Sequence, residues 1–442
     1  MKTKKNIDFI VILFILTVLF SIIKTYMSDI SRNEENIYEE KTDIRMLNNW
    51  GNHNIRNEII NNYFSEYMKS HHNLNIVNES MSGDEFYVKL YTDFASGYAP
   101  DILALSPNRA VKDLFIKGKI ADLTDIFKAD EMWNNTIDSS MVQYTSCNGR
   151  IFGVPTDMKF YCLYVNEKIF SQYGIKIPEN YEELKNSVVQ LKNNEIIPMS
   201  FSIKDSQILL YQMFVALIGG NSELENPVKE GRISDCYIKA FDYVRELEEL
   251  GAFPENYKEI DYKTELELFL GGNAAMMVGD SDVASIIAGG RDNYTEGLTV
   301  TAFPEIKGKT EFITTPFGAG DGTYYISSEA FENKNEDIVD LIKNITSPEL
   351  SVKFLNNSKN MINVKISQPP IAEVGISFKR ALLLQKINEP TAIPSQVVSH
   401  ISWRKVIYDN FDKVIANEKS ADEIWREALM FDNQNFLKGN DR

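Results

Sequence analysis

Residues 95–101 read Ala-Ser-Gly-Tyr-Ala-Pro-Asp, and the apolar run Ile-Leu-Ala-Leu follows at residues 102–105. Glycine adopts the left-handed backbone conformation that commonly ends a helix, and the residue before a proline avoids the helical conformation. The stretch therefore predicts a helix that stops at Gly97, a turn at Pro100, and a short buried strand over residues 102–105.

Strand and helix signals alternate on both sides of this stretch. Strands are predicted over residues 42–50, 74–77, 157–166, 274–278 and 297–303, and an Asn-Gly turn at residues 148–149 predicts a hairpin. Apolar residues at helical spacing predict helices over residues 58–69, 84–95, 110–116, 167–173, 181–191, 207–217, 234–250 and 263–269. Strands that alternate with helices favour an α/β fold with mainly parallel sheets.

Length, composition and charge narrow the class of protein. A chain of 442 residues exceeds the size at which one core keeps growing, so two or more folding units are expected. Hydrophobic residues make up 43% and charged residues 25% of the chain, as in ordinary globular proteins. The net charge of −17, from 46 basic and 63 acidic residues, argues against nucleic acid as a partner, because nucleic-acid binding needs a basic surface.

The N-terminal segment has the pattern of a membrane signal. Lysines precede an apolar run over residues 9–23, which predicts that this end stays in the cytoplasm. Neither a small-residue cleavage motif nor a cysteine for lipid attachment follows the run. We therefore expect an uncleaved anchor over residues 1–27, with a cleaved secretory signal as the alternative. The acidic, non-periodic residues 28–41 are a predicted linker, and the rest is expected at the extracellular face of the cytoplasmic membrane.

Signals for metal, cofactor or catalytic sites are weak in this sequence. The histidines are scattered without a cysteine or carboxylate at ligand spacing, so we expect no metal site and no cofactor. No nucleophile elbow occurs, and no spacing selects an acid/base pair of carboxylates, so we expect no enzyme. Cys147 and Cys162 flank the predicted hairpin. Their pairing stays open, although unpaired buried thiols are favoured for these two and for Cys236.

Six segments, in order along the chain, carry a family resemblance. They are residues 95–105, Gly118-Lys-Ile-Ala-Asp-Leu-Thr, residues 157–166 with the following Glu-Lys-Ile-Phe-Ser-Gln-Tyr-Gly, Pro178-Glu-Asn-Tyr-Glu-Glu-Leu, Phe269-Leu-Gly-Gly-Asn-Ala-Ala-Met, and Gly318-Ala-Gly-Asp-Gly-Thr-Tyr-Tyr. Together they resemble extracellular solute-binding protein family 1, the sugar-type, maltose-binding-protein-like binding components of ABC importers. The resemblance runs from about residue 42 to the C-terminus.

The resemblance implies a fold and a division into domains. It implies a two-lobed periplasmic-binding-protein-like fold of type II, in which each lobe is a mixed sheet flanked by helices. Lobe 1 would comprise residues 42–158 plus 327–362, and lobe 2 residues 166–316 plus 367–442. Hinge crossings would join the lobes near residues 159–165, 317–326 and 363–366.

The same resemblance implies a function without catalysis. A monomer would close around a small molecule, expected to be a mono- or oligosaccharide, and deliver it to ABC permease subunits. Because the family's usual lipid-attachment cysteine is missing, an anchored ligand sensor that works with a signalling partner is an alternative role. An extracellular carbohydrate-active enzyme is a more distant one.

Candidate ligand contacts follow from the family's cleft positions. Sugars present apolar faces and a rim of hydroxyls, so aromatic and hydrogen-bonding side chains are expected. The residues expected to bind ligand are Asn48, Trp50, Asn108, Arg109, Asp157, Phe160, Asp280, Asp282, Asp321, Tyr324 and Trp403. A purely structural role is the alternative at several of them: core packing at Trp50 and Trp403, a helix cap at Asn108, and a solvated side chain at Arg109. Tyr211 and Phe214 share a helix and are expected in the core.

Overall fold

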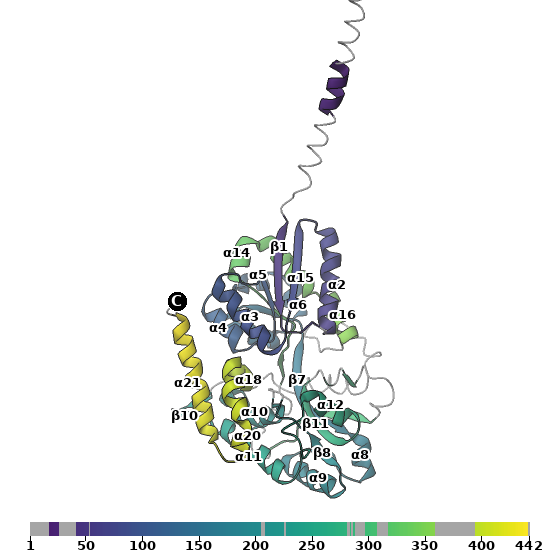
Figure 1. The fold of residues 1–442 in the computed structure, drawn as a ribbon, viewed down its shortest axis with the longest axis vertical. Coiled ribbons are helices and arrows are strands. Elements are labelled where there is room, and N and C mark those ends of the chain that lie inside the picture. The colour runs from purple at the N-terminus through teal and green to yellow at the C-terminus, as the bar shows by residue number, and fades with distance from the viewer. Residues whose placement is uncertain are drawn as a thin grey trace, which may run out of the picture. The chain divides into compact units, whose positions relative to one another are not determined.

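The computed structural model describes residues 17–25, 41–52, 54–204, 208–224, 227–280, 283, 286–287, 297–306, 317–358 and 394–440 (Figure 1). The chain divides into two compact units, residues 1–44 with 63–77 and residues 45–62 with 78–442. The hydrophobic clusters and the candidate site described below lie in the second unit.

The first sheet is mixed and has the strand order β2-β1-β3-β14-β6. Its strands are β1 (Thr42–Asn48), β2 (Leu74–Ser80), β3 (Ile102–Ala104), β6 (Gly153–Pro155) and β14 (Thr323–Ile326). β1 and β3 are parallel, with Met46 opposite Ile102, whereas β14 runs antiparallel to both β3 and β6. A strand from the last third of the chain thus lies between two strands from its first half.

The stretch at residues 95–105 forms the predicted helix, turn and strand. The helix α3 (Gly83–Ser96) ends at Gly97, whose backbone is left-handed with φ of 74°. After the turn, the Asp101 carboxylate accepts a hydrogen bond from the backbone N–H of Arg45 at 2.7 Å and pairs with the Lys334 ammonium at 2.9 Å. β3 follows with all three residues buried, because strands cover both of its edges. The motif therefore fixes β3 beside β1.

Helices α3 and α4 (Arg109–Ile116) bury their apolar faces against the first sheet. Leu90 of α3 and Val111 of α4 are completely buried with Leu103 and Tyr325 of the sheet. Such burial removes apolar area from water and is the main source of stability for this core.

The second sheet is also mixed, with the order β12-β7-β11-β8. Its strands are β7 (Met158–Asn166), β8 (Ile197–Ser200), β11 (Ala274–Asp280) and β12 (Leu298–Thr301), and β13 (Phe317–Ala319) pairs with the start of β7. β8 and β11 are parallel, whereas β7 is antiparallel to β11 and β12. At one end of this sheet, the carboxyl ends of β8 and β11 therefore lie beside the start of β7.

Helices from distant parts of the chain share the core of the second sheet. They are α8 (Glu167–Gln172), α9 (Tyr181–Asn193), α10 (Leu209–Leu224), α11 (Asp235–Glu249), α20 (Phe411–Ile415) and α21 (Ala421–Asn440). Tyr211 and Phe214 are completely buried, which confirms their predicted core role. Trp425 of α21 donates a hydrogen bond from Nε1 to the Tyr211 hydroxyl at 2.7 Å, so the C-terminal helix is part of this core.

The remaining elements complete the described part of the chain. The helices are α2 (Ile55–Ser70), α5 (Thr124–Ala129), α6 (Glu131–Thr136), α7 (Ser139–Val142), α12 (Tyr262–Leu270), α14 (Ser328–Asn333), α15 (Asn335–Ile345), α16 (Pro348–Ser358), α18 (Pro394–Val397) and α19 (His400–Ser402), with the short turns η1 (Gln143–Thr145), η3 (Trp403–Ile407) and η4 (Tyr408–Asn410). The strands β4 (Ser146–Cys147) and β5 (Arg150–Ile151) form the predicted hairpin, and β9 (Val228–Lys229) pairs with β10 (Arg232–Ile233).

The predicted helices and strands agree with the structure, but the expectation of mainly parallel sheets was wrong, because β7 runs antiparallel to β11 and β12, and β14 runs antiparallel to β3 and β6. The expected helices and strands all appear where the structure describes the chain, and β11 extends two residues beyond the predicted strand, to Asp280. β8 and helices α5 to α7 were not predicted, because these short segments lack a long apolar period, and the longer helices α15 and α21 were missed as well. Cys147, Cys162 and Cys236 are free thiols.

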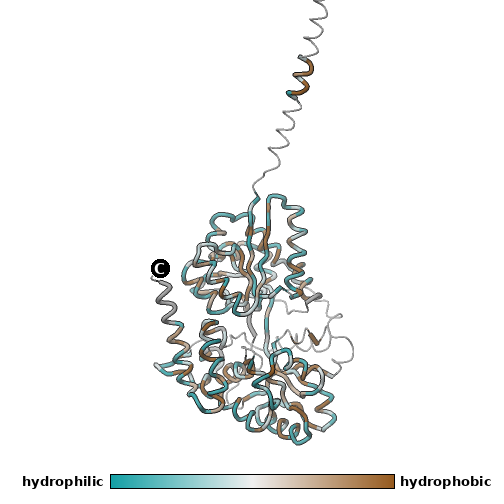
Figure 2. Tube along the Cα trace, viewed as in Figure 1, coloured by the Kyte–Doolittle hydropathy of each residue, from teal (hydrophilic) through white to brown (hydrophobic). Residues whose placement is uncertain are grey.

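The predicted N-terminal anchor falls largely outside the described residues. Residues 17–25 form a helix that is mostly hydrophobic up to Ile23 (Figure 2), and its Phe20 side chain is 71% exposed. In the part of the chain that the structure describes, no helix is both long enough and apolar enough to cross a membrane.

Candidate functional site

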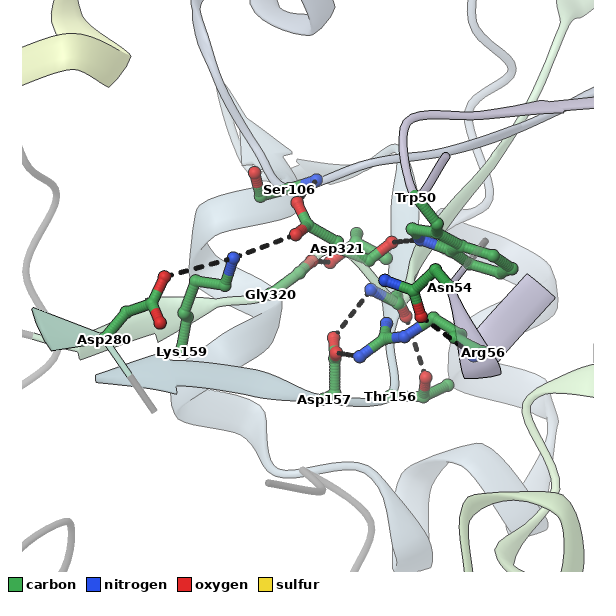
Figure 3. Close-up of polar contacts among 12 residues, drawn as sticks. Trp50, Asn54, Arg56, Ser106, Thr156, Asp157, Lys159, Asp280, Gly320 and Asp321 are labelled. Atoms are coloured by element: carbon green, nitrogen blue, oxygen red, sulfur yellow. Dashed lines mark hydrogen bonds and ion pairs between the residues drawn. The ribbon is translucent and has the colours of Figure 1, made fainter. Parts of the chain in front are cut away.

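A buried ion pair joins the start of α2 to the residue before β7. Figure 3 shows Arg56 directed toward Asp157, and their side chains are only 6% and 8% exposed. The other Asp157 oxygen accepts a hydrogen bond from the backbone N–H of Gly322 at 2.8 Å. This carboxylate therefore connects α2, β7 and the loop between β13 and β14.

Glycines allow this loop to approach Asp157. A Cβ atom at Gly320 would lie 2.7 Å from the Asp157 Oδ1 atom, and one at Gly322 would lie 2.8 Å from the same atom. Both separations are shorter than a Cβ atom tolerates. The Gly-Asp-Gly sequence at residues 320–322 is thus required by close packing, and it leaves Asp321 as the one side chain of the loop tip.

Lys159 lies between two further carboxylates. Its ammonium is 3.0 Å from the Asp321 carboxylate and 3.6 Å from that of Asp280, the last residue of β11 (Figure 3). Asp321 also accepts hydrogen bonds at 3.3 Å from the backbone N–H of Ser106 and from the Asn49 side chain. Asp280, Lys159 and Asp321 thus form a chain of charges from the second sheet to the loop between β13 and β14.

Trp50 belongs to the same cluster. Its indole Nε1 donates a hydrogen bond to the backbone carbonyl of Asp321 at 2.9 Å, and the ring is 7% exposed. The Arg56 guanidinium lies 5.3 Å from the centre of this ring, and Tyr324 meets its edge at 6.4 Å. The tryptophan therefore packs against the loop between β13 and β14 and against the buried guanidinium of Arg56.

The charges of the cluster shift one another's proton affinities. Burial by itself would raise the pKa of the Asp321 carboxyl, but Lys159 and Arg56 outweigh burial and hold this pKa well below its usual value. Burial raises the pKa of Asp157, although Arg56 opposes the effect. Burial would lower the pKa of Arg56, but Asp157 and Asp321 raise it, so the guanidinium stays charged.

A pocket of about 260 Å³ opens beside this cluster. It lies where β8 and β11 end and β7 begins, the edge of an α/β sheet at which ligands commonly bind. Lys159 and Asp280 belong to both the cluster and the pocket, and the other residues that line it are Met199, Ser200, Phe201, Ser202, Ile208, Leu209, Leu210, Tyr262, Glu265, Val278 and Ile286.

The polar groups of this pocket suit a small polar ligand with apolar faces. Asp280 and Glu265 supply carboxylates, and Phe201 and Tyr262 supply aromatic rings. The hydroxyls of Ser200 and Ser202 donate to the backbone carbonyls of Met276 and Ile260, and the Ser202 oxygen also accepts from the backbone N–H of Lys204 at 3.1 Å, so these hydroxyls can meet a ligand only as acceptors. Among the residues that the structure describes, no group of three histidine, cysteine or carboxylate side chains is arranged to hold a metal ion.

The structure brings together five of the predicted site residues. Trp50, Asp157, Asp280, Asp321 and Tyr324 all belong to the cluster or touch it, and Asp280 also lines the pocket. Tyr324 is completely buried, and its hydroxyl has no hydrogen-bond partner in the described part of the chain. Direct contact of these residues with a ligand stays a prediction.

Four predicted residues occupy other surroundings. Asn48 is buried, and its carboxamide oxygen accepts hydrogen bonds from the backbone N–H of Trp50 at 3.0 Å and from Ser80 at 2.6 Å. Asn108 caps α4 through the N–H of Val111, and Arg109 pairs with Asp113 at 2.8 Å. Trp403 is 3% exposed in the core of the second sheet. The side chain of Phe160 and all of Asp282 lie outside the described residues.

Sequence reasoning missed Lys159 and Arg56. Lys159 had a usable signal, because it lies two residues after Asp157 in a predicted strand and therefore shares a face with it. Arg56 had none, since it lies 101 residues from its partner Asp157. The pocket residues Ser200, Ser202 and Glu265 were also missed, because β8 was not predicted and α12 carries no distinctive motif.

The lowered pKa of Asp321 gives a testable pH dependence. Replacing Asp321 with Asn should reduce the free energy of unfolding by about 1–3 kcal/mol at neutral pH, because a charged hydrogen-bond acceptor for Lys159 is lost. A depressed folded-state pKa contributes stability above the ordinary pKa of 3.8, and this stability is lost as the pH falls toward the folded-state value. The difference between the two proteins in urea denaturation should therefore shrink below about pH 4. A difference that stays constant down to pH 2.5 would contradict this role.

Comparison with known proteins identifies the class. The family model of bacterial extracellular solute-binding proteins matches residues 50–350, more than half of the chain. The chain belongs to this family, whose members bind substrates outside the cytoplasm. Among curated protein sequences none matches this chain.

Solved structures share the fold at low sequence identity. A structure from work on xylan utilization by the thermophilic bacterium Caldanaerobius polysaccharolyticus has a TM-score of 0.74 and 18% identity, and the match covers 88% of this chain and 99% of that one. A chitin oligosaccharide binding protein has a TM-score of 0.74 and 17% identity over 89% and 99% of the two chains. Maltose-bound MalE3 of T. maritima has a TM-score of 0.70 and 17% identity over 88% and 99%. These likenesses confirm the predicted α/β fold class of two-lobed binding proteins.

Proposed function

We propose that this protein binds a mono- or oligosaccharide in the pocket beside Lys159 and delivers it to the permease subunits of an ABC importer. The observation that carries the proposal is the pocket itself, in which carboxylate, hydroxyl and aromatic groups converge at the carboxyl ends of β8 and β11. Solved structures with this fold include proteins described as binding chitin oligosaccharide, maltose and raffinose. The role requires no bond to be made or broken, so the protein acts as a receptor and not as an enzyme.

Ligand delivery would rely on hinge closure. Lobe 1 is residues 42–158 plus 327–362, and lobe 2 is residues 166–316 plus 367–442. Support comes from Lys334, which pairs with Asp101 at 2.9 Å, and from α20 and α21, which pack in the core of the second sheet. A ligand that contacts both lobes favours the closed form over the open one.

The protein would work as a monomer at the extracellular face of the cytoplasmic membrane. The apolar residues 9–23, preceded by lysines, would anchor it there. The exposed apolar side chains of residues 18–23 support this role, because exposed apolar side chains gain stability from an apolar surrounding.

Binding of sugars by the full-length chain tests the proposal. Calorimetry against a panel of neutral mono- and oligosaccharides should find at least one ligand, and small-angle scattering should then show a more compact particle. Replacing Tyr262 with Ala should weaken binding of that ligand about tenfold, because an aromatic contact in the pocket is lost.

A matched tyrosine provides the control for this measurement. Tyr243 lines a separate groove with Glu182 and Glu246, so Tyr243→Ala should leave the affinity unchanged. The proposal fails if no sugar of the panel binds the folded protein, or if both tyrosine variants bind the sugar as the parent does.

A further inference from the structure

The walls of the pocket carry more negative than positive charge. Among its described lining residues, Lys159 is the cation, and Asp280 and Glu265 are the carboxylates. Each carboxylate residue is only 8% exposed, so water screens these charges weakly. Asp321, which pairs with Lys159 at 3.0 Å, adds a third carboxylate beside the pocket. Among the described residues, the pocket and the neighbouring cluster together carry Lys159 and Arg56 against the carboxylates of Asp157, Asp280, Asp321 and Glu265, so negative charge exceeds positive charge by two.

Lys159, the one cation among the described lining residues, is already engaged by two of these carboxylates. Lys159 contacts Asp321 at 3.0 Å and Asp280 at 3.6 Å, and its side chain is 21% exposed. An anionic group of a ligand that approached Lys159 would have to compete with both carboxylates. It would also stand close to Asp280, where like charges repel in a weakly screened surrounding.

The uncharged groups of the pocket add acceptors and few donors. The Ser200 hydroxyl donates to the Met276 carbonyl at 3.5 Å, and the Ser202 hydroxyl donates to the Ile260 carbonyl. The Ser200 oxygen can then only accept from a ligand, and the Ser202 oxygen, which already accepts from the backbone N–H of Lys204 at 3.1 Å, has one further acceptor position. Together with the carboxylates of Asp280 and Glu265, this wall favours ligand groups that donate hydrogen bonds, such as hydroxyl or ammonium groups.

We infer that the pocket selects uncharged or amino-bearing sugars and rejects acid sugars, with Glu265 as a specificity-determining residue. The inference rests on the proposed function, because it assumes that this pocket is where the sugar binds. A neutral sugar donates hydroxyl hydrogens to the carboxylates, and an amino sugar adds an ammonium that the negative wall attracts. A uronic acid brings a carboxylate that can only accept and that the wall repels.

Matched sugars that differ at a single group test this selectivity. The probes are the neutral sugar, its 2-amino derivative and its uronic acid in the gluco, galacto and manno series, measured by calorimetry with the full-length chain at neutral pH. In the series that binds, the uronic acid should bind at least about tenfold more weakly than the neutral sugar, and the amino sugar at least as tightly. Higher salt should narrow the gap, because it screens the repulsion.

Variants on one helix assign the effect to Glu265. Glu265→Gln keeps the shape of the side chain and removes its charge, so it should reduce the preference for the neutral sugar over the uronic acid by about tenfold. Glu267 lies on the same helix with its side chain 65% exposed, and Glu267→Gln should leave the preference unchanged. Thermal unfolding of both variants checks that they are folded.

The outcomes separate the inference from the proposed function. If neutral sugars bind and the uronic acid binds equally well or more tightly, the charge selectivity is overturned while the proposed function stands. If Glu265→Gln and Glu267→Gln change the preference alike, the assignment to Glu265 is overturned. If no sugar of any charge binds, the proposed function fails, and the inference fails with it.

Discussion

Replacing Arg56 with Ala should lower the free energy of unfolding by about 3–5 kcal/mol, because it leaves the Asp157 carboxylate buried without its counter-ion. Both side chains of this pair are less than 10% exposed, so water cannot replace the guanidinium. Urea denaturation at neutral pH, followed by tryptophan fluorescence, measures the loss. Trp50 packs against Arg56 and reports on this region directly.

Two further variants separate charge from shape at this pair. The double variant Arg56→Ala with Asp157→Asn should recover part of the lost stability, because no unpaired charge remains buried. Lowering the pH should also reduce the stability loss of Arg56→Ala, since burial already raises the pKa of Asp157 and protonation removes the charge.

Arg109→Ala is the control, because it removes a partly exposed partner of Asp113 and should cost no more than about 1 kcal/mol. Equal losses for Arg56→Ala and Arg109→Ala would refute the role of the buried pair.

Replacing Trp425 with Ala should cost about 3–5 kcal/mol, because it opens a large cavity in the core of the second sheet. The indole is completely buried, its ring centre lies 4.4 Å from that of Tyr237, and its Nε1 bonds to the Tyr211 hydroxyl. Trp425→Phe keeps most of the volume and should cost less, which isolates the hydrogen bond and the remaining gap. Denaturation followed by circular dichroism measures both variants.

A residue one turn and a half along the same helix provides the control. Met430 is 60% exposed, and Met430→Ala should change the free energy of unfolding by less than about 0.5 kcal/mol. Because Trp425 belongs to the C-terminal helix, a large loss also supports the proposal that residues 367–442 are part of lobe 2. A small loss for Trp425→Ala would mean that α21 contributes little to that core.

The features of this protein that could be predicted are the turns, strands and helices that short stretches of sequence encode. The stop at Gly97, the turn at Pro100 and the buried run of β3 each follow from the conformational preferences of a few neighbouring residues. Helices α9 and α11 follow from apolar residues at helical spacing. β8 could not be predicted, because a strand of four residues has too short a pattern to separate it from a loop.

The candidate site was predictable only in part. Asp157, Asp280 and Asp321 were found because the family resemblance marks the ends of strands and the crossing loop. Lys159 was missed although it shares a strand face with Asp157, and Glu265 was missed because a carboxylate on an amphipathic helix has no distinctive pattern. The resemblance also pointed to Asn108, which the structure places as the cap of α4.

The sequence alone indicated many of the strands and helices, the family and the fold class, because turn residues, apolar spacing and ordered motifs act over short distances along the chain. Only the tertiary structure decided that Arg56 pairs with Asp157, that Lys159 bridges Asp280 and Asp321, and that a negatively charged pocket opens beside them. These contacts join residues more than 100 positions apart, and charges interact through space, so no local pattern in the chain encodes them.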